Sequence, residues 1–200
     1  MIEELEDAIR EGQAKKLAKL LDAGADVNAR SGKYSLITLA VILNQPAILA
    51  LLLERGADPD ATNPIGTAAR AGRAKMVDAL LAAGAKPVPI DCERWQTPLL
   101  QAAYSGHAGI VKRMLAAGAA IDFVDDYGRS ALFLAAMEGP SKNHTKTVEI
   151  LIAAGADVNQ RGQGGYTPLG IARRNGRPDV EARLVAAGAI AAKPEKAAKR

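Results

Sequence analysis

Three side chains in this chain of 200 residues are of the types that act as a general base or a thiol nucleophile: Cys92, His107 and His144. Histidine titrates near neutral pH, and a histidine beside a cysteine can deprotonate the thiol for nucleophilic attack. Cys92 has no histidine close to it in sequence, which argues against such a pair. As the lone cysteine, it also excludes an internal disulfide and an all-cysteine metal site.

Two further patterns resemble parts of catalytic sites but lack the surroundings that such sites need. The glycine-rich run 162–165 does not follow a buried strand, as a phosphate-binding loop would. Four aspartates recur at separations of 32, 64 and 35 residues, close to one or two times a common interval, which is typical of turn formers and not of an acid–base pair: Asp26, Asp58, Asp122 and Asp157. No metal-ligand spacing occurs in the sequence. We therefore expect no catalytic activity, no cofactor and no metal.

A short sequence segment that contains a Gly-Ala step occurs six times, at about the same interval as these aspartates. Its glycines are Gly24, Gly56, Gly84, Gly118, Gly155 and Gly188, with separations of 32, 28, 34, 37 and 33 residues. A period near 33 residues indicates a stacked solenoid in which each unit contacts only its neighbours. The sequence therefore predicts one continuous domain with a long, thin core.

The clearest unit begins at Thr97 and predicts two short helices. Thr97 can cap the first helix, and Pro98 suits its first turn, where a missing backbone N–H costs nothing. Gly106 is expected to end this helix in the left-handed conformation, and Gly118 to end the second helix. The second helix is marked by apolar residues at helical spacing: Ile110, Val111, Met114 and Leu115. Each unit is thus a helix, a turn, a second helix and an extended hairpin.

With Thr-Pro-Leu at the first helix, Gly-His before the second and Leu-Leu-x-x-Gly-Ala-Asp at its end, the chain resembles the ankyrin repeat family. The Thr-Pro position is held by Ser35-Leu36, Asn63-Pro64, Thr97-Pro98, Ser130-Ala131 and Thr167-Pro168. The resemblance implies an all-α ankyrin-repeat solenoid of helix-turn-helix units with short β-hairpin finger loops. It also implies that His107 and His144, at the Gly-His position, have structural roles. Cys92 is expected to be a passive finger residue.

The repeat frame divides residues 1–190 into units of approximately 1–29, 30–60, 61–89, 90–123, 124–160 and 161–190. The remaining residues, 191–200, are expected to form a flexible basic tail. The first unit begins inside its own helix, with Leu5, Ala8 and Ile9 facing inward. It is therefore expected to be an N-terminal cap with an acidic outer face.

Two units depart from the repeat period, and both departures are expected to lie in loops. Asn63 follows Gly56 by only seven residues, whereas the corresponding later segments take twelve. This deletion predicts a notch between the second and third units. In the fifth unit four residues are inserted after Glu138. Because asparagine tolerates a left-handed turn, Asn143 is expected to form that turn and the second helix to begin at His144.

Aromatic residues give the best indication of a binding surface. Five of them map to hairpins and two to first helices: Tyr34, Trp95, Phe123, Tyr127 and Tyr166, then Tyr104 and Phe133. The resemblance implies that hairpins and first helices form a concave surface that grips a partner, and Tyr, Trp and Arg are frequent interface hot spots. Packing between successive fingers is the alternative for Phe123, Phe133 and Tyr166.

The predicted partner-binding residues lie on this face and combine aromatic, apolar and charged side chains. They are Lys33, Tyr34, Ile42, Leu43, Arg70, Arg94, Trp95, Tyr104, Asp126, Tyr127, Arg129 and Met137. Ile42 and Leu43 form an apolar pair where contact residues are expected, although packing beneath the shortened hairpin explains them equally well. Charges of both signs favour a folded protein partner over nucleic acid, which would need a continuous basic stripe.

The sequence therefore predicts a non-catalytic protein–protein interaction module, such as a stand-alone inhibitor, an immunity protein or an adaptor. One alternative is attachment to nucleic acid or an anionic membrane through the tail 191–200. A second is an enzyme, which would require Cys92, His107 and a carboxylate to meet. No secretion signal and no apolar stretch of membrane-spanning length occur in the sequence, so we expect a cytoplasmic protein that is monomeric when free.

Overall fold

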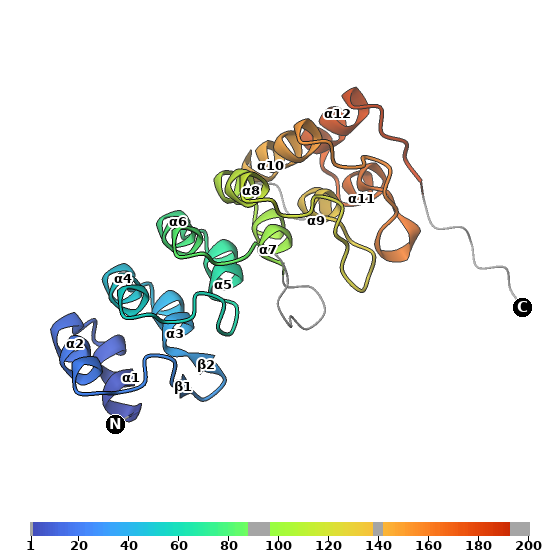
Figure 1. The fold of residues 1–200 in the computed structure, drawn as a ribbon. Helices are drawn as coiled ribbons and strands as arrows, with labels where there is room; N and C mark the ends of the chain where they lie inside the picture. Colours follow the sequence, from blue (N-terminus) through green and yellow to red (C-terminus); the bar gives the residue numbers. More distant parts are fainter. Residues whose placement is uncertain (1, 88–96, 138–141, 193–200) are drawn as a thin grey trace, which may run out of the picture.

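The computed structural model describes residues 2–87, 97–137 and 142–192, which form a rising stack of helix pairs (Figure 1). The first helices of the pairs are α1 (Ile2–Arg10), α3 (Leu36–Ile42), α5 (Pro64–Arg70), α7 (Pro98–Tyr104), α9 (Ala131–Met137) and α11 (Pro168–Arg174). The second helices are α2 (Ala14–Asp22), α4 (Pro46–Glu54), α6 (Ala74–Ala82), α8 (Ala108–Ala116), α10 (Lys142–Ala153) and α12 (Pro178–Ala186). Each first helix contacts the first helix of the next pair, and the second helices do the same. The expected all-α solenoid is confirmed.

Each first helix after α1 begins at a side chain that caps it. The backbone N–H of Leu100 donates to Thr97 Oγ1 at 3.1 Å, and Pro98 occupies the first helical position. The equivalent bond joins a backbone N–H to the side-chain oxygen of the capping residue in the other helices: Thr38 to Ser35, Gly66 to Asn63, Phe133 to Ser130 and Gly170 to Thr167. Such a cap contributes about 1 kcal/mol. The local sequence therefore sets where every one of these helices starts.

The repeated Gly-Ala step ends each second helix by a single backbone pattern. At the end of α8, Gly118 has a φ of +87°, and its N–H donates to the carbonyl of Leu115. The N–H of Ala119 then donates to the carbonyl of Met114 at 2.9 Å, and the methyl group of Ala119 is buried. This pair of bonds is the Schellman arrangement, in which glycine supplies the left-handed residue. Glycine fits because it lacks the Cβ that makes a positive φ costly for most other residues.

The core lies between the two rows of helices and consists mainly of alanine, leucine, isoleucine and valine. Phe133 of α9 is the largest of the fully buried side chains among the described residues. A Cβ on Gly162 would lie 2.6 Å from the Phe133 ring, so the absent side chain makes room for it. In α1, Leu5, Ala8 and Ile9 are buried, as expected of a terminal cap.

The described loops between units, 23–35, 55–63, 117–130 and 154–167, project on the side of the first helices (Figure 1). The first of them is a small antiparallel hairpin of β1 (Arg30–Ser31) and β2 (Tyr34–Ser35). A bridge joins Val124 to Ser130 in a later loop, and a short 3-10 helix, η1 (Gln163–Gly165), lies in the last. None of the helices that the structure describes is long and apolar enough to cross a bilayer.

The start of α10 differs from the expectation. The helix begins at Lys142, two residues before His144, so Asn143 lies inside the helix instead of forming the turn. Part of the insertion therefore extends the helix by half a turn, because the segment before the buried core positions is free to take helical geometry. His144 is nevertheless buried, as its structural role requires.

Candidate functional site

The last residue of each first helix after α1 belongs to one row along the array. These residues each stand seven positions after the capping residue: Ile42, Arg70, Tyr104, Met137 and Arg174. The side chains of Arg70, Tyr104 and Arg174 are exposed, and those of Ile42 and Met137 are half-buried. We call these five residues the terminal row. Because consecutive first helices are in contact, the row runs along the array with one residue from each of the second to sixth units.

Four backbone carbonyls of the terminal row accept a hydrogen bond from a side chain of the following unit. His107 donates from Nε2 to the carbonyl of Arg70 at 3.2 Å, and His144 donates to that of Tyr104 at 3.0 Å. The same link is made by Arg73 to Ile42 at 3.1 Å and by Asn175 to Met137 at 2.6 Å. Burial lowers the pKa of Arg73. The two histidines thus have the structural roles that the resemblance implied.

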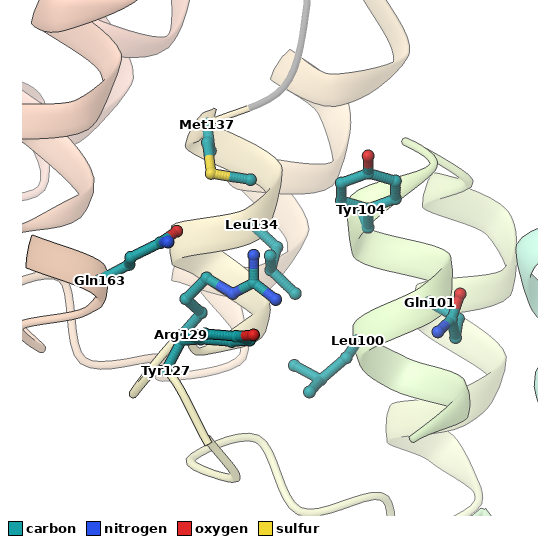
Figure 2. A pocket seen from close by; sticks show the side chains of 8 residues that line it. All are labelled: Leu100, Gln101, Tyr104, Tyr127, Arg129, Leu134, Met137 and Gln163. Carbon is teal, nitrogen blue, oxygen red and sulfur yellow. The ribbon is translucent and has the colours of Figure 1, made fainter. Parts of the chain in front are cut away.

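Two members of the terminal row line a pocket of about 340 Å³ between α7, α9 and the adjacent loops (Figure 2). Its lining, which we call the tyrosine pocket, is Leu100, Gln101, Tyr104, Tyr127, Arg129, Leu134, Met137 and Gln163. Tyr104 is 41% exposed and Tyr127 is 51% exposed, whereas Leu100 and Leu134 are buried. Apolar side chains therefore lie at the base of the pocket, and two accessible aromatic rings stand at its rim.

The loop that carries Tyr127 is fixed by a buried carboxylate. Asp125, whose side chain is fully buried, accepts hydrogen bonds from the N–H groups of Tyr127 (2.9 Å) and Arg129 (2.8 Å). It also accepts a bond from Arg129 Nε at 2.7 Å. The guanidinium of Arg129 lies 4.8 Å from the centroid of the Tyr127 ring, a cation–π distance. Tyr127 is therefore presented by a rigid loop, which lowers the entropic cost of binding.

A second pocket, of about 420 Å³, lies beside the shortened loop. Its lining, which we call the basic pocket, is Lys33, Tyr34, Thr62, Asn63, Gly66, Thr67, Arg70 and Gln101. Thr62 and Asn63 both have left-handed backbone conformations, with φ of 56° and 57°, and they turn the chain directly into α5. Because Gln101 lines both pockets, the basic pocket and the tyrosine pocket adjoin.

The structure gathers predicted site residues into two groups. Tyr104, Tyr127, Arg129 and Met137 meet in the tyrosine pocket. Lys33, Tyr34 and Arg70 meet in the basic pocket, where the deletion had predicted a notch.

Other candidates lie elsewhere. Ile42 and Leu43 line neither pocket, and half-buried Leu43 packs against the core, so packing explains it. Asp126 is exposed on the Tyr127 loop without lining either pocket. Arg94, Trp95 and Cys92 fall outside the described residues.

Several pocket residues were missed from the sequence. Gln101 and Leu134 stand four positions after their capping residues, one helical turn before Tyr104 and Met137. That spacing places them on the same helix face as the terminal row, so the repeat frame contained the signal. Gln163 carried no such signal, since it reaches the tyrosine pocket from the loop of the next unit. The packing alternative holds for Phe133, which is buried, and Phe123 and Tyr166 are half-buried against the core.

Among the described residues, no histidine or carboxylate lines the tyrosine pocket or the basic pocket. No cluster of three metal-ligating side chains occurs in residues 2–87, 97–137 and 142–192. The side chains that line the pockets are donors, acceptors, aromatic rings and cations, which bind by hydrogen bonding and packing. Neither histidine faces a pocket, because each ring is bonded to a backbone carbonyl and packs beside Gly72 or Gly106.

Comparison with known proteins gives consistent matches. A family model described as "Ankyrin repeats (3 copies)" matches residues 65–162 and 99–194, and a model described as "Ankyrin repeat" matches residues 31–64. The ankyrin repeat protein nuc-2 of Neurospora crassa is 30% identical over 185 residues, which are 86% of this chain and 17% of that protein. Protein phosphatase 1 regulatory subunit 27 of Mus musculus is 36% identical over 70 residues, 35% of this chain and 43% of that protein. The chain thus spans less than half of these relatives.

Two solved structures share the fold over nearly their whole length. An ankyrin repeat domain from Acinetobacter baumannii superposes with a TM-score of 0.84 and 29% identity, covering 93% of this chain and 98% of that one. The ankyrin repeat protein EF0377 superposes with a TM-score of 0.81 and 25% identity, with the same coverage of both chains.

Proposed function

The chain belongs to the ankyrin repeat family, whose repeats are protein–protein interaction modules, and we propose that it binds a folded protein partner through the tyrosine and basic pockets. The observation that carries this proposal is the convergence of Tyr104 and Tyr127 on one pocket with an apolar base. Tyrosine is one of the residues enriched at interface hot spots, which cluster in well-packed pockets. A specific complex would bury about 800 Å² of each partner.

Within that class we propose that the protein regulates or scaffolds its partner and does no chemistry itself. Similarity over 70 residues to a protein named as a phosphatase regulatory subunit supports a regulatory role. An inhibitor, an immunity protein and an adaptor all fit this proposal. A cytoplasmic location and a monomeric free state stay predictions.

The proposal is tested by quantitative capture of partners from an extract of the source cells. The wild-type chain is compared with Tyr104→Ala/Tyr127→Ala, and captured proteins are measured by mass spectrometry. We expect at least one protein to be lost about a hundredfold from the double variant, since each ring contributes about 1–2 kcal/mol or more at a hot spot.

The matched control is Leu115→Ala/Ile150→Ala, which removes two half-buried apolar side chains from the surface between α8 and α10. It should lose no partner. Equal recovery with the wild-type chain and the tyrosine variant would overturn the proposed surface.

The tail alternative is separated by a truncation. Residues 193–200 contain Lys193, Lys196, Lys199 and Arg200. Ala192 must be kept, because its N–H donates to Thr167 Oγ1 at 3.1 Å. Removal of 193–200 should leave partner capture unchanged, whereas attachment through the tail predicts its loss.

A further inference from the structure

The basic pocket contains two cations that converge without a carboxylate. Lys33 enters from the β1–β2 hairpin and Arg70 from the end of α5, and no acidic residue lines the pocket. Within the described part of the chain, neither side chain forms an ion pair. The Lys33 ammonium instead lies 5.0 Å from the centroid of the Tyr34 ring. In contrast, Arg129 of the neighbouring tyrosine pocket is already neutralised by Asp125.

The polar groups around these cations suit a carboxylate. Tyr34 brings a hydroxyl group to the lining, and arginine binds a carboxylate through two parallel hydrogen bonds. The lining also contains Gly66, whose missing side chain leaves room for the Asn63 amide, since a Cβ there would lie 2.5 Å from Asn63 Nδ2.

The tyrosine pocket next to it has a different preference. Leu100, Leu134 and Met137 make its base apolar, and its volume of about 340 Å³ accommodates one large side chain. Gln101, which is 6% exposed, forms the boundary between the two pockets. Adjacent helices of such an array are about 8–10 Å apart, so the pocket centres are separated by roughly 10–20 Å. An extended chain covers that distance in about three to six residues.

We propose that the two pockets together receive one extended acidic segment of the partner protein. A glutamate or aspartate carboxylate binds Lys33 and Arg70 in the basic pocket. An aromatic or large aliphatic side chain three to six residues away fills the tyrosine pocket. This inference rests on the proposed function and adds the chemistry of the segment that the partner presents.

The test uses peptides as the probe and the full chain as the receptor. Random peptides of about twelve residues, long enough to cross both pockets, are displayed on phage and selected on the immobilised protein. The most enriched peptide is synthesised with a fluorescent label, and its Kd is measured by fluorescence polarisation. We expect enriched peptides to pair an acidic residue with an aromatic or large aliphatic residue at the stated spacing.

Two changes then probe the same contact from both sides. We expect Lys33→Gln/Arg70→Gln to weaken peptide binding about tenfold, and replacement of the peptide's acidic residue by its amide to do the same. Combining them should weaken binding little further, because both remove one interaction. The control variant Lys75→Gln/Lys112→Gln, which removes two exposed charges from α6 and α8, should bind as the wild type does.

Three results would overturn the inference: the selected peptides lack an acidic residue, no peptide is selected, or the peptide's Kd is the same for the wild type and for Lys33→Gln/Arg70→Gln. If such a Kd still rises with Tyr104→Ala, the proposed function stands and only the acidic segment is wrong. If it responds to neither variant, both proposals are contradicted.

Discussion

His144 holds the end of the preceding repeat: its Nε2 donates to the carbonyl oxygen of Tyr104 at 3.0 Å. The last carbonyls of a helix have no partner within the helix, so the ring satisfies an acceptor that α7 cannot. It thereby fixes the residue whose aromatic ring stands at the rim of the tyrosine pocket.

Replacing His144 with alanine is therefore expected to affect both stability and binding. The change removes the bond to Tyr104 and empties a buried position, and it should lower the free energy of unfolding by about 1–3 kcal/mol. Urea denaturation followed by circular dichroism measures this loss. His107→Ala, which releases Arg70 instead, is the matched variant. A free energy of unfolding unchanged by His144→Ala would show that the link does not stabilise the array.

Glycines with the same backbone conformation should differ in their tolerance of alanine. Gly72 has a φ of +73°, and a Cβ there would lie 2.7 Å from His107 Cε1. Gly84 has a φ of +90°, but a Cβ would meet nothing within 4 Å. Both substitutions strain the backbone by about 1–2 kcal/mol, and Gly72→Ala should cost about 1–3 kcal/mol more by displacing the ring. Equal melting temperatures for the two variants would contradict this packing.

Asp125 is expected to be the most sensitive carboxylate of the Tyr127 loop. Asp125→Ala leaves two backbone N–H groups without their acceptor and removes the buried partner of Arg129. We expect a loss of about 3 kcal/mol in the free energy of unfolding, measured by urea denaturation. Asp122→Ala, an exposed position in the same loop, should cost less than about 0.5 kcal/mol. Similar losses for both variants would refute the anchoring role.

A pH-dependent contribution to stability is expected at the junction of α10 and α12. The Thr145 hydroxyl donates to the Asp179 carboxylate and lowers the pKa of Asp179 below its ordinary value. A carboxyl group with a lowered folded-state pKa stabilises the fold above its unfolded pKa of about 3.9. That contribution is lost as the pH falls through the lower folded-state pKa.

Asp179→Asn should therefore lower the melting temperature at pH 7, and the difference from wild type should shrink below about pH 4. The effect is small because Asp179 is exposed and screened by solvent. Thermal scans across this pH range measure it, with Asp122→Asn as the exposed control. A difference that persists at pH 2 would assign the loss to packing instead of ionisation.

Features encoded within a few residues were predictable from the sequence. Thr97 and Gly118 set helix ends through bonds to their own neighbours, so the repeat and its helices follow from local chemistry. The start of α10 was misjudged because the inserted residues are compatible with helix as well as with a turn. Local pattern alone does not choose between those two conformations.

The candidate site was predictable only in part, because its pockets join residues from different units. Tyr104 and Tyr127 were identified by residue type, and the repeat frame placed both on one side. Gln163 enters the same pocket from the next loop, a contact set by the stacking angle and not by its own sequence. Its apolar side chain made Leu43 a predicted contact residue, but Leu43 packs against the core and is half-buried there.

His107, His144 and Asn175 each donate to the last carbonyl of the first helix in the preceding repeat, so these links of the terminal row all run from a later repeat to the one before it. During synthesis, the repeat that has just left the ribosome therefore lacks this hydrogen bond until the next repeat emerges. Truncation is therefore expected to have different effects at the two ends of the array. A deletion from the C-terminal end should loosen the repeat that becomes last, as well as removing its own contacts.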